Sequence, residues 1–76
     1  MKYYRVIYER CFSKIIKGRF THNQVIDDVE LNKMIDDMKK FHYEIFSDLK
    51  TIKYVYSDFS SFGVRKKVYE LYLSKI

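Results

Sequence analysis

Apolar and polar side chains alternate along the first ten residues of the chain. In an extended chain Tyr4, Val6 and Tyr8 fall on one face, and Arg5 falls on the other. Tyrosine, valine and isoleucine favour strands, and a repeat of two residues is typical of a strand with one buried face. This alternation predicts a strand over residues 2–10.

A second, shorter alternation covers residues 14–20. Ile16 and Phe20 share one face of an extended chain, whereas Lys17 and Arg19 share the other. Few residues separate this segment from the first strand, and a short connection favours an antiparallel hairpin. We therefore expect residues 14–20 to form the second strand of the sheet.

The apolar spacing changes to three and four residues over the segment 28–47. The residues that follow this spacing are Leu31, Met34, Ile35, Met38, Phe41, His42 and Ile45. Such spacing is typical of a helix that buries one face. Asp27 or Asp28 can cap the helix start, and Glu30 adds negative charge near its positive end. The pattern predicts one long helix over residues 28–47.

Strand character returns in the last third of the chain. Residues 51–57 alternate, with Ile52 and Tyr56 on one face. Residues 64–74 fit two patterns: the β-forming run YELYL favours a strand, whereas Ser61 could cap a helix over the same segment. We expect the strand and keep the helix as the alternative.

The predicted element order is ββαββ, or ββαβα if the last segment is helical. Residues 1–76 contain no internal repeat and no linker, so we expect a single domain. The predicted class is α+β, a small two-layer domain with one helix packed on one face of an antiparallel sheet. The other sheet face is then left to solvent or to a partner.

The composition adds a surplus of aromatic residues to this picture. The 76 residues include 8 Tyr and 6 Phe, and 47% of the chain is hydrophobic. Each buried aromatic side chain removes on the order of 150–250 Å² from water. This is more aromatic surface than a single core between one helix and one sheet needs. Part of the surplus alternates onto the sheet face that the helix does not cover.

Residues with AT-rich codons dominate, since the chain has no Ala, Pro or Trp and only two Gly. In this respect it resembles the small, Ala-poor, Tyr- and Lys-rich proteins of phages and mobile elements in low-GC bacteria. That resemblance implies a protein that occupies a surface of a host enzyme or defence complex. Because Cys11 is the only cysteine and no apolar run is long enough for a membrane span, we expect a cytoplasmic protein of a low-GC bacterium or its phage host.

The residue types that carry catalysis or bind metals form no recognisable motif. His22 and His42 lack HxxxH or HExxH spacing, and the chain has no P-loop, EF-hand or nucleophile-elbow pattern. We interpret His22 as a turn residue, His42 as a packed boundary residue and Cys11 as a small packed thiol. We expect no catalytic residue, no cofactor, no metal and no enzymatic activity.

The charges are unevenly distributed along the chain. The net charge is +5, yet residues 23–37 carry five acidic residues against one lysine. A candidate acidic interaction surface at the helix consists of Asp27, Asp28, Glu30, Asp36 and Asp37. A candidate mixed surface on the helix-free sheet face consists of Tyr3, Arg5, Lys17, Arg19, Lys53, Lys66 and Tyr72.

Basic groups interleaved with aromatic ones suit two kinds of partner. Tyrosine and arginine are typical anchors of protein interfaces, whereas cations and flat rings together bind single-stranded nucleic acid. A solvated sheet face with lysines that block edge pairing explains the same residues without a partner. We expect a small binding protein that acts on a larger protein or nucleoprotein complex, with a nucleic-acid-binding module as the alternative. A homodimer through a sheet edge or face is a further expectation.

Overall fold

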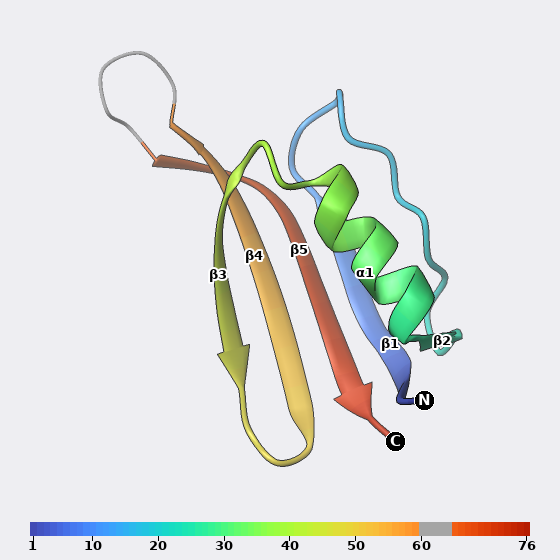
Figure 1. Ribbon diagram of the computed structural model, residues 1–76. Coiled ribbons are helices and arrows are strands. Elements are labelled where there is room, and N and C mark those ends of the chain that lie inside the picture. Colours follow the sequence, from blue (N-terminus) through green and yellow to red (C-terminus); the bar gives the residue numbers. More distant parts are fainter. Residues whose placement is uncertain (60–64) are drawn as a thin grey trace.

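The computed structural model describes residues 1–59 and 65–76, which form one antiparallel sheet and one helix. The elements are β1 (Tyr3–Cys11), β2 (Val25–Asp27), α1 (Asp28–Asp37), β3 (His42–Ser47), β4 (Thr51–Phe59) and β5 (Arg65–Lys75). The strands lie in the order β2-β1-β5-β4-β3. The helix packs across one face of the sheet on the side of β1, and the opposite face carries no helix (Figure 1). The predicted α+β class with two layers is confirmed.

Three of the predicted strands are present with nearly the expected bounds. The first is β1, and the predicted strand over residues 51–57 is the first part of β4. The last segment is the strand β5, so the helical alternative for residues 64–74 is wrong. Ser61, the proposed cap of that helix, lies outside the described residues.

The segment 14–20 is not a strand, contrary to the sequence prediction. It runs as an irregular loop, in which the Ile16 N–H donates to the Ser13 carbonyl in a turn and the N–H groups at its end donate to a side chain instead of a sheet ladder. The Glu9 carboxylate accepts the N–H groups of Arg19 at 3.1 Å and Phe20 at 3.3 Å. The short strand β2 takes the expected place beside β1, with Ile26 opposite Tyr4.

The helix is shorter than predicted, because residues 42–47 form the strand β3. Asp27 is the N-cap, and its side chain accepts the N–H of Glu30 at 3.0 Å. The helix ends at Asp37. The aromatic and β-branched residues that follow pair with β4, with Tyr43 opposite Tyr56. The element order is therefore ββαβββ, and neither ββαββ nor ββαβα is found.

The core lies between α1 and the strands beneath it. Its buried apolar residues are Val6, Ile26, Leu31, Met34, Met38, Tyr54, Tyr56, Val68, Tyr69, Leu71 and Leu73. The helix contributes Leu31 and Met34 and its C-cap contributes Met38, at the three- and four-residue spacing that the sequence predicts. No helix in the described part of the chain has the length and apolar character needed to cross a membrane.

Candidate interaction surface

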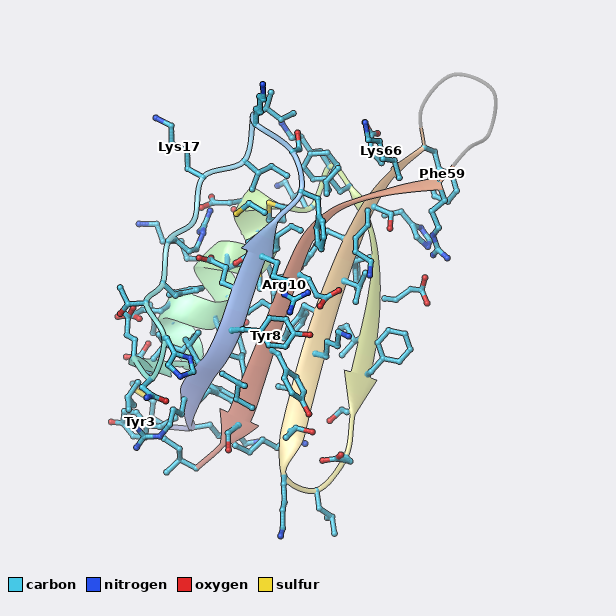
Figure 2. The ribbon with its side chains drawn as sticks, turned by 180° about the vertical axis from the view of Figure 1, so that it is seen from behind. Tyr3, Tyr8, Arg10, Lys17, Phe59 and Lys66 are labelled. Atoms are coloured by element: carbon cyan, nitrogen blue, oxygen red, sulfur yellow. The ribbon has the colours of Figure 1, made fainter. Side chains whose placement is uncertain are left out.

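The helix-free face of the sheet carries a cluster of polar and aromatic side chains from its three central strands. Figure 2 views the molecule from this side and shows Tyr8 and Arg10 projecting from β1. Tyr8 lies opposite Tyr72 of β5 in the ladder, and Tyr72 lies opposite Lys53 of β4. Directly opposite residues in antiparallel strands share a face. These strands therefore bring three side chains from distant parts of the sequence into one patch.

A β-bulge explains why Tyr8 belongs to this face. Strict alternation places Tyr8 on the same side as Val6, which is fully buried in the core. The register of β1 against β5 shifts between Val6 and Tyr8, so one extra residue, Ile7, is inserted. An inserted residue reverses the facing of every side chain after it. Tyr8 and Arg10 consequently point away from the helix.

Glu70 of β5 is the centre of the cluster. Only 4% of this residue is exposed, which is rare for a glutamate. Tyr8 Oη donates a hydrogen bond to Glu70 Oε1 at 2.5 Å, and Lys67 Nζ donates to Oε2 at 3.0 Å. Lys53 Nζ lies 3.6 Å from Oε1. One buried carboxylate thus fixes a phenol and two ammonium groups on the sheet surface.

The surroundings of Glu70 stabilise its ionised form. Burial alone raises the pKa of a carboxyl group, but the hydrogen bonds from Tyr8 and Lys67 and the charges of Lys53 and Lys67 outweigh it. The pKa of Glu70 therefore lies below its ordinary value. Burial and the hydrogen bond to Glu70 raise the pKa of Tyr8, so this phenol stays protonated as a donor.

Aromatic rings surround the Glu70 cluster and pair with cations. The rings of Tyr8 and Tyr72 lie 5.3 Å apart between centroids, and the Arg10 guanidinium lies 4.9 Å above the Tyr8 ring. Lys67 Nζ, which also bonds Glu70, lies 5.6 Å from the Phe12 ring centroid. Such cation–π pairs hold a cation over a ring at modest energetic gain.

An open hollow of about 410 Å³ lies beside the cluster. The residues that line it are Tyr8, Phe46, Ser47, Asp48, Thr51, Lys53 and Tyr72. Phe46 of β3 forms one wall and is about half exposed. The hollow therefore joins apolar rings with a lysine and a carboxylate, which is the mixture that protein anchors use. We name the set Tyr8, Arg10, Phe46, Lys53, Lys67, Glu70 and Tyr72 the outer-face cluster.

The structure brings together only part of the mixed surface that the sequence predicts. Lys53 and Tyr72 lie in the outer-face cluster. Arg5 lies further along β1 and donates through Nη1 to the Asn23 carbonyl at 3.3 Å. Figure 2 shows Tyr3 at the end of the sheet that carries the N-terminus and Lys66 at the opposite end.

Lys17 and Arg19 do not lie on the helix-free face, and their predicted placement is wrong. Both belong to the loop that replaces the expected second strand. The Arg19 guanidinium pairs with Asp37 at the end of α1 at 2.9 Å. Lys17 lines a hollow between this loop and the helix, together with Asp37 and Phe41.

The acidic residues of the predicted acidic surface gather at the helix, but most have structural partners. Asp27 caps α1, and Asp28 accepts the N–H of Lys2 at 3.1 Å. Asp36 pairs with Lys39 at 3.4 Å, and Asp37 pairs with Arg19. The fifth residue, Glu30, lies in the first turn of the helix, where negative charge is favourable.

The histidines and the cysteine occupy places that packing explains. His22 Nδ1 lies 2.5 Å from the Ile7 carbonyl, which can only accept, so this nitrogen carries a proton. The His42 ring contacts the Phe59 ring edge to face at 5.1 Å. Partial burial and the nearby Glu9 charge raise the pKa of Cys11. Within the described residues, no three His, Cys, Asp or Glu side chains are grouped so that they could hold a metal ion.

Sequence reasoning missed five members of the outer-face cluster. The alternation places Tyr8 and Arg10 on the core face because it contains no sign of the bulge. Phe46 falls in the predicted long helix, whereas the structure has it in β3. Glu70 carried one available signal, because it is an acidic residue in the apolar run VYELYL and therefore a candidate buried charge. Lys67 precedes it by three residues.

A scan against protein-family models, a search of curated proteins and a search of solved structures each found no match for this chain.

Proposed function

We propose that this chain is a small non-enzymatic binding protein that uses the helix-free sheet face to occupy a surface of a larger protein. The observation that supports this proposal is the outer-face cluster, in which a buried carboxylate fixes tyrosines and cations on a rigid sheet. Rigid aromatic anchors lose little conformational entropy on binding, and Tyr and Arg dominate interface hot spots. The composition favours an inhibitor or modulator encoded by a phage or mobile element, acting in the bacterial cytoplasm.

The charges favour a protein partner over a nucleic acid. Lys53 and Lys67 share the single negative charge of Glu70, so this trio keeps a net charge of only +1, and Arg19 is paired with Asp37. Nucleic-acid affinity depends on the number of phosphates that free cations neutralise. Arg5 and Arg10 of β1 remain for an external anion on this side of the sheet, since neither has a carboxylate partner among the described residues. A partner surface with a few acidic groups around an apolar patch fits this arrangement.

Affinity capture with matched charge reversals tests the proposal. The tagged protein, its Arg10→Glu variant and its Lys33→Glu variant are each incubated with lysate of a low-GC bacterium. Lys33 lies exposed on the helix, so its reversal changes the net charge equally but leaves the sheet face intact. We expect a protein captured by the wild type to be retained by Lys33→Glu and lost with Arg10→Glu. Equal capture by both variants would contradict the proposal.

Single-stranded nucleic acid is the second candidate, because Arg10 and Tyr8 offer a cation stacked on a ring. Titration into labelled single-stranded and double-stranded oligonucleotides at ~50 and ~200 mM salt separates the two candidates. We expect no binding at the lower salt. Binding that falls steeply with salt and is lost in Arg10→Glu would favour the nucleic acid instead.

A further inference from the structure

The strand β3 is a free edge with apolar residues on both of its faces. The strand order leaves it paired to β4 alone in the described part of the chain. Tyr43, Ile45 and Phe46 are 51%, 48% and 54% exposed. Unpaired N–H and C=O groups along such an edge form a template for another strand.

The features that usually protect an edge strand are missing from β3. Its sequence HYEIFS contains no lysine and no proline, and its register with β4 has no bulge. Its one charged side chain, Glu44, is paired with Arg65 of the same chain. The other sheet edge, β2, is only three residues long. The two edges therefore differ, and β3 is the one open to pairing.

The helix also leaves an apolar strip uncovered beside β3. Tyr43 lies opposite Tyr56 and Ile45 opposite Tyr54, and both partners are buried in the core. Opposite residues share a face, so Tyr43 and Ile45 belong to the helix side of the sheet. Figure 1 shows α1 on the side of β1 and β5, away from β3.

We propose that β3 pairs antiparallel with β3 of a second copy of this chain, on a twofold axis that passes through Ile45. Such an axis is perpendicular to the sheet and keeps the two helices on the same side. The uncovered strips of both copies then lie side by side between the helices, where opposite side chains such as the two Ile45 residues contact each other. The two five-stranded sheets become one continuous sheet.

The charged side chains favour this register of the two β3 strands over the neighbouring registers. With Ile45 on the axis, Tyr43 faces Ser47 of the second copy, and His42 faces Asp48 at both ends of the pair. An axis through Glu44 places the two Glu44 side chains opposite each other. An axis through Phe46 places Glu44 opposite Asp48 of the second copy. Like charges directly opposite each other destabilise a strand pair, whereas an imidazole opposite a carboxylate is compatible.

Light scattering coupled to size exclusion tests the dimer over concentrations from about 10 µM to about 1 mM, because self-association depends on concentration. We expect the wild-type mass to rise from one chain to two. Ile45→Lys places two lysines at the axis and should remain a single chain. Val29→Lys, at a helix residue that is 64% exposed, should behave as the wild type. A wild type that stays monomeric throughout, or an Ile45→Lys variant that still dimerises, overturns the proposal.

Cysteine cross-linking tests the register independently, in a Cys11→Ser background. Two residues on the axis have Cα atoms about 4.5–5.5 Å apart, which allows a disulfide. We therefore expect Ile45→Cys to form a linked dimer under mild oxidation. Residue 46 lies opposite Glu44 of the second copy. The two copies of residue 46 are therefore diagonal neighbours about 8 Å apart, so Phe46→Cys should not form a disulfide. Equal linking of both variants, or none, contradicts this register.

The dimer and the proposed function can fail separately. Arg10 lies on β1, away from β3 in the strand order, so Arg10→Glu should dimerise like the wild type. A dimer that dissociates in Arg10→Glu indicates packing through the outer face and overturns edge pairing.

Discussion

At the level of single residues, Glu70 determines how the outer face is organised. Its carboxylate is held by Tyr8, Lys53 and Lys67, and removing one partner of a buried charged network leaves the others unsatisfied. The same residue makes the free energy of unfolding depend on pH, because the pKa of Glu70 is lowered in the folded state. Both properties can be measured without knowing the partner.

We expect Glu70→Gln to lower the free energy of unfolding by about 1–3 kcal/mol at neutral pH, because the amide cannot replace the charge-assisted hydrogen bonds. A carboxyl group whose pKa is lowered on folding stabilises the folded state at pH values above its pKa in the unfolded chain, which is 4.5 for Glu70. That contribution is lost as the pH falls below this value through the folded pKa. Urea unfolding from pH 7 to pH 3 should therefore show the gap between wild type and variant closing below about pH 4.5.

Glu30→Gln is the matched control for Glu70, since Glu30 is exposed on the helix. It should change the free energy of unfolding by no more than about 0.5 kcal/mol. A gap between wild type and Glu70→Gln that is constant with pH would show that folding does not change the pKa of Glu70, and would contradict the lowered pKa.

Tyr56 and Tyr69 give opposite expectations for the same substitution. Tyr56 Oη is buried without a hydrogen-bond partner among the described residues, and burial raises the pKa of Tyr56 to about 12. Tyr69 Oη donates to Glu9 Oε2 at 2.5 Å. We expect Tyr56→Phe to leave the free energy of unfolding unchanged or raise it by about 1 kcal/mol, and Tyr69→Phe to lower it by about 1–2 kcal/mol. Chemical denaturation measures both, and equal losses would be evidence for an unseen partner of Tyr56.

At the level of elements, the loop between β1 and β2 depends on Glu9. Its carboxylate accepts backbone N–H groups of the loop and the Tyr69 hydroxyl. A Cβ atom at Gly18 would lie 2.8 Å from Glu9 Oε1, closer than such atoms approach. The glycine therefore leaves room for the Glu9 carboxylate, which would have to shift and weaken its loop hydrogen bonds if residue 18 were alanine; the backbone conformation at Gly18 is one that alanine can adopt.

Gly18→Ala consequently tests how firmly the loop is held. Replacing glycine with alanine at a compatible backbone position raises the free energy of unfolding by about 0.4–1 kcal/mol, because it lowers the conformational entropy of the unfolded chain. We expect the clash to outweigh this gain and the free energy of unfolding to fall by about 1–2 kcal/mol. Lys17→Ala, at the exposed neighbouring position, should have little effect in the same urea titration. A stabilised Gly18→Ala variant would mean that Glu9 moves aside at no cost.

The strands with long alternating patterns could be predicted from the sequence, and the irregular features could not. β1, β4 and β5 have enough β-forming residues to be recognised individually. β3 was missed because Phe41 and Ile45 continue the spacing of the helix by coincidence, and pairing with β4 decides their conformation. The pattern predicts a strand over 14–20 because side-chain capping by Glu9 leaves no trace in the hydrophobic pattern.

The same reasons apply to the interaction surface. Lys53 and Tyr72 were predicted because they lie on strands whose facing was correct. The alternation predicts Tyr8 on the core face because a bulge has no signature in the alternation. Arg19 was placed on the wrong side because its segment is a loop.

At the level of the whole molecule, one short helix covers only part of a five-stranded sheet. α1 has 10 residues, whereas β5 alone has 11. The helix rises 1.5 Å per residue and a strand about 3.4 Å. The helix therefore cannot shield the whole sheet, and the aromatic surplus in the sequence lies on the uncovered parts. These parts are the outer-face cluster and the edge at β3.

The outer-face cluster as binding surface is the central claim, and chemical-shift mapping tests it most directly. The captured partner is added to isotope-labelled protein, and the backbone amide shifts are followed residue by residue. We predict the largest changes at Tyr8, Arg10, Lys53 and Tyr72, with little change at Lys33 on the helix. Changes centred on α1, with the central strands unaffected, would contradict the account.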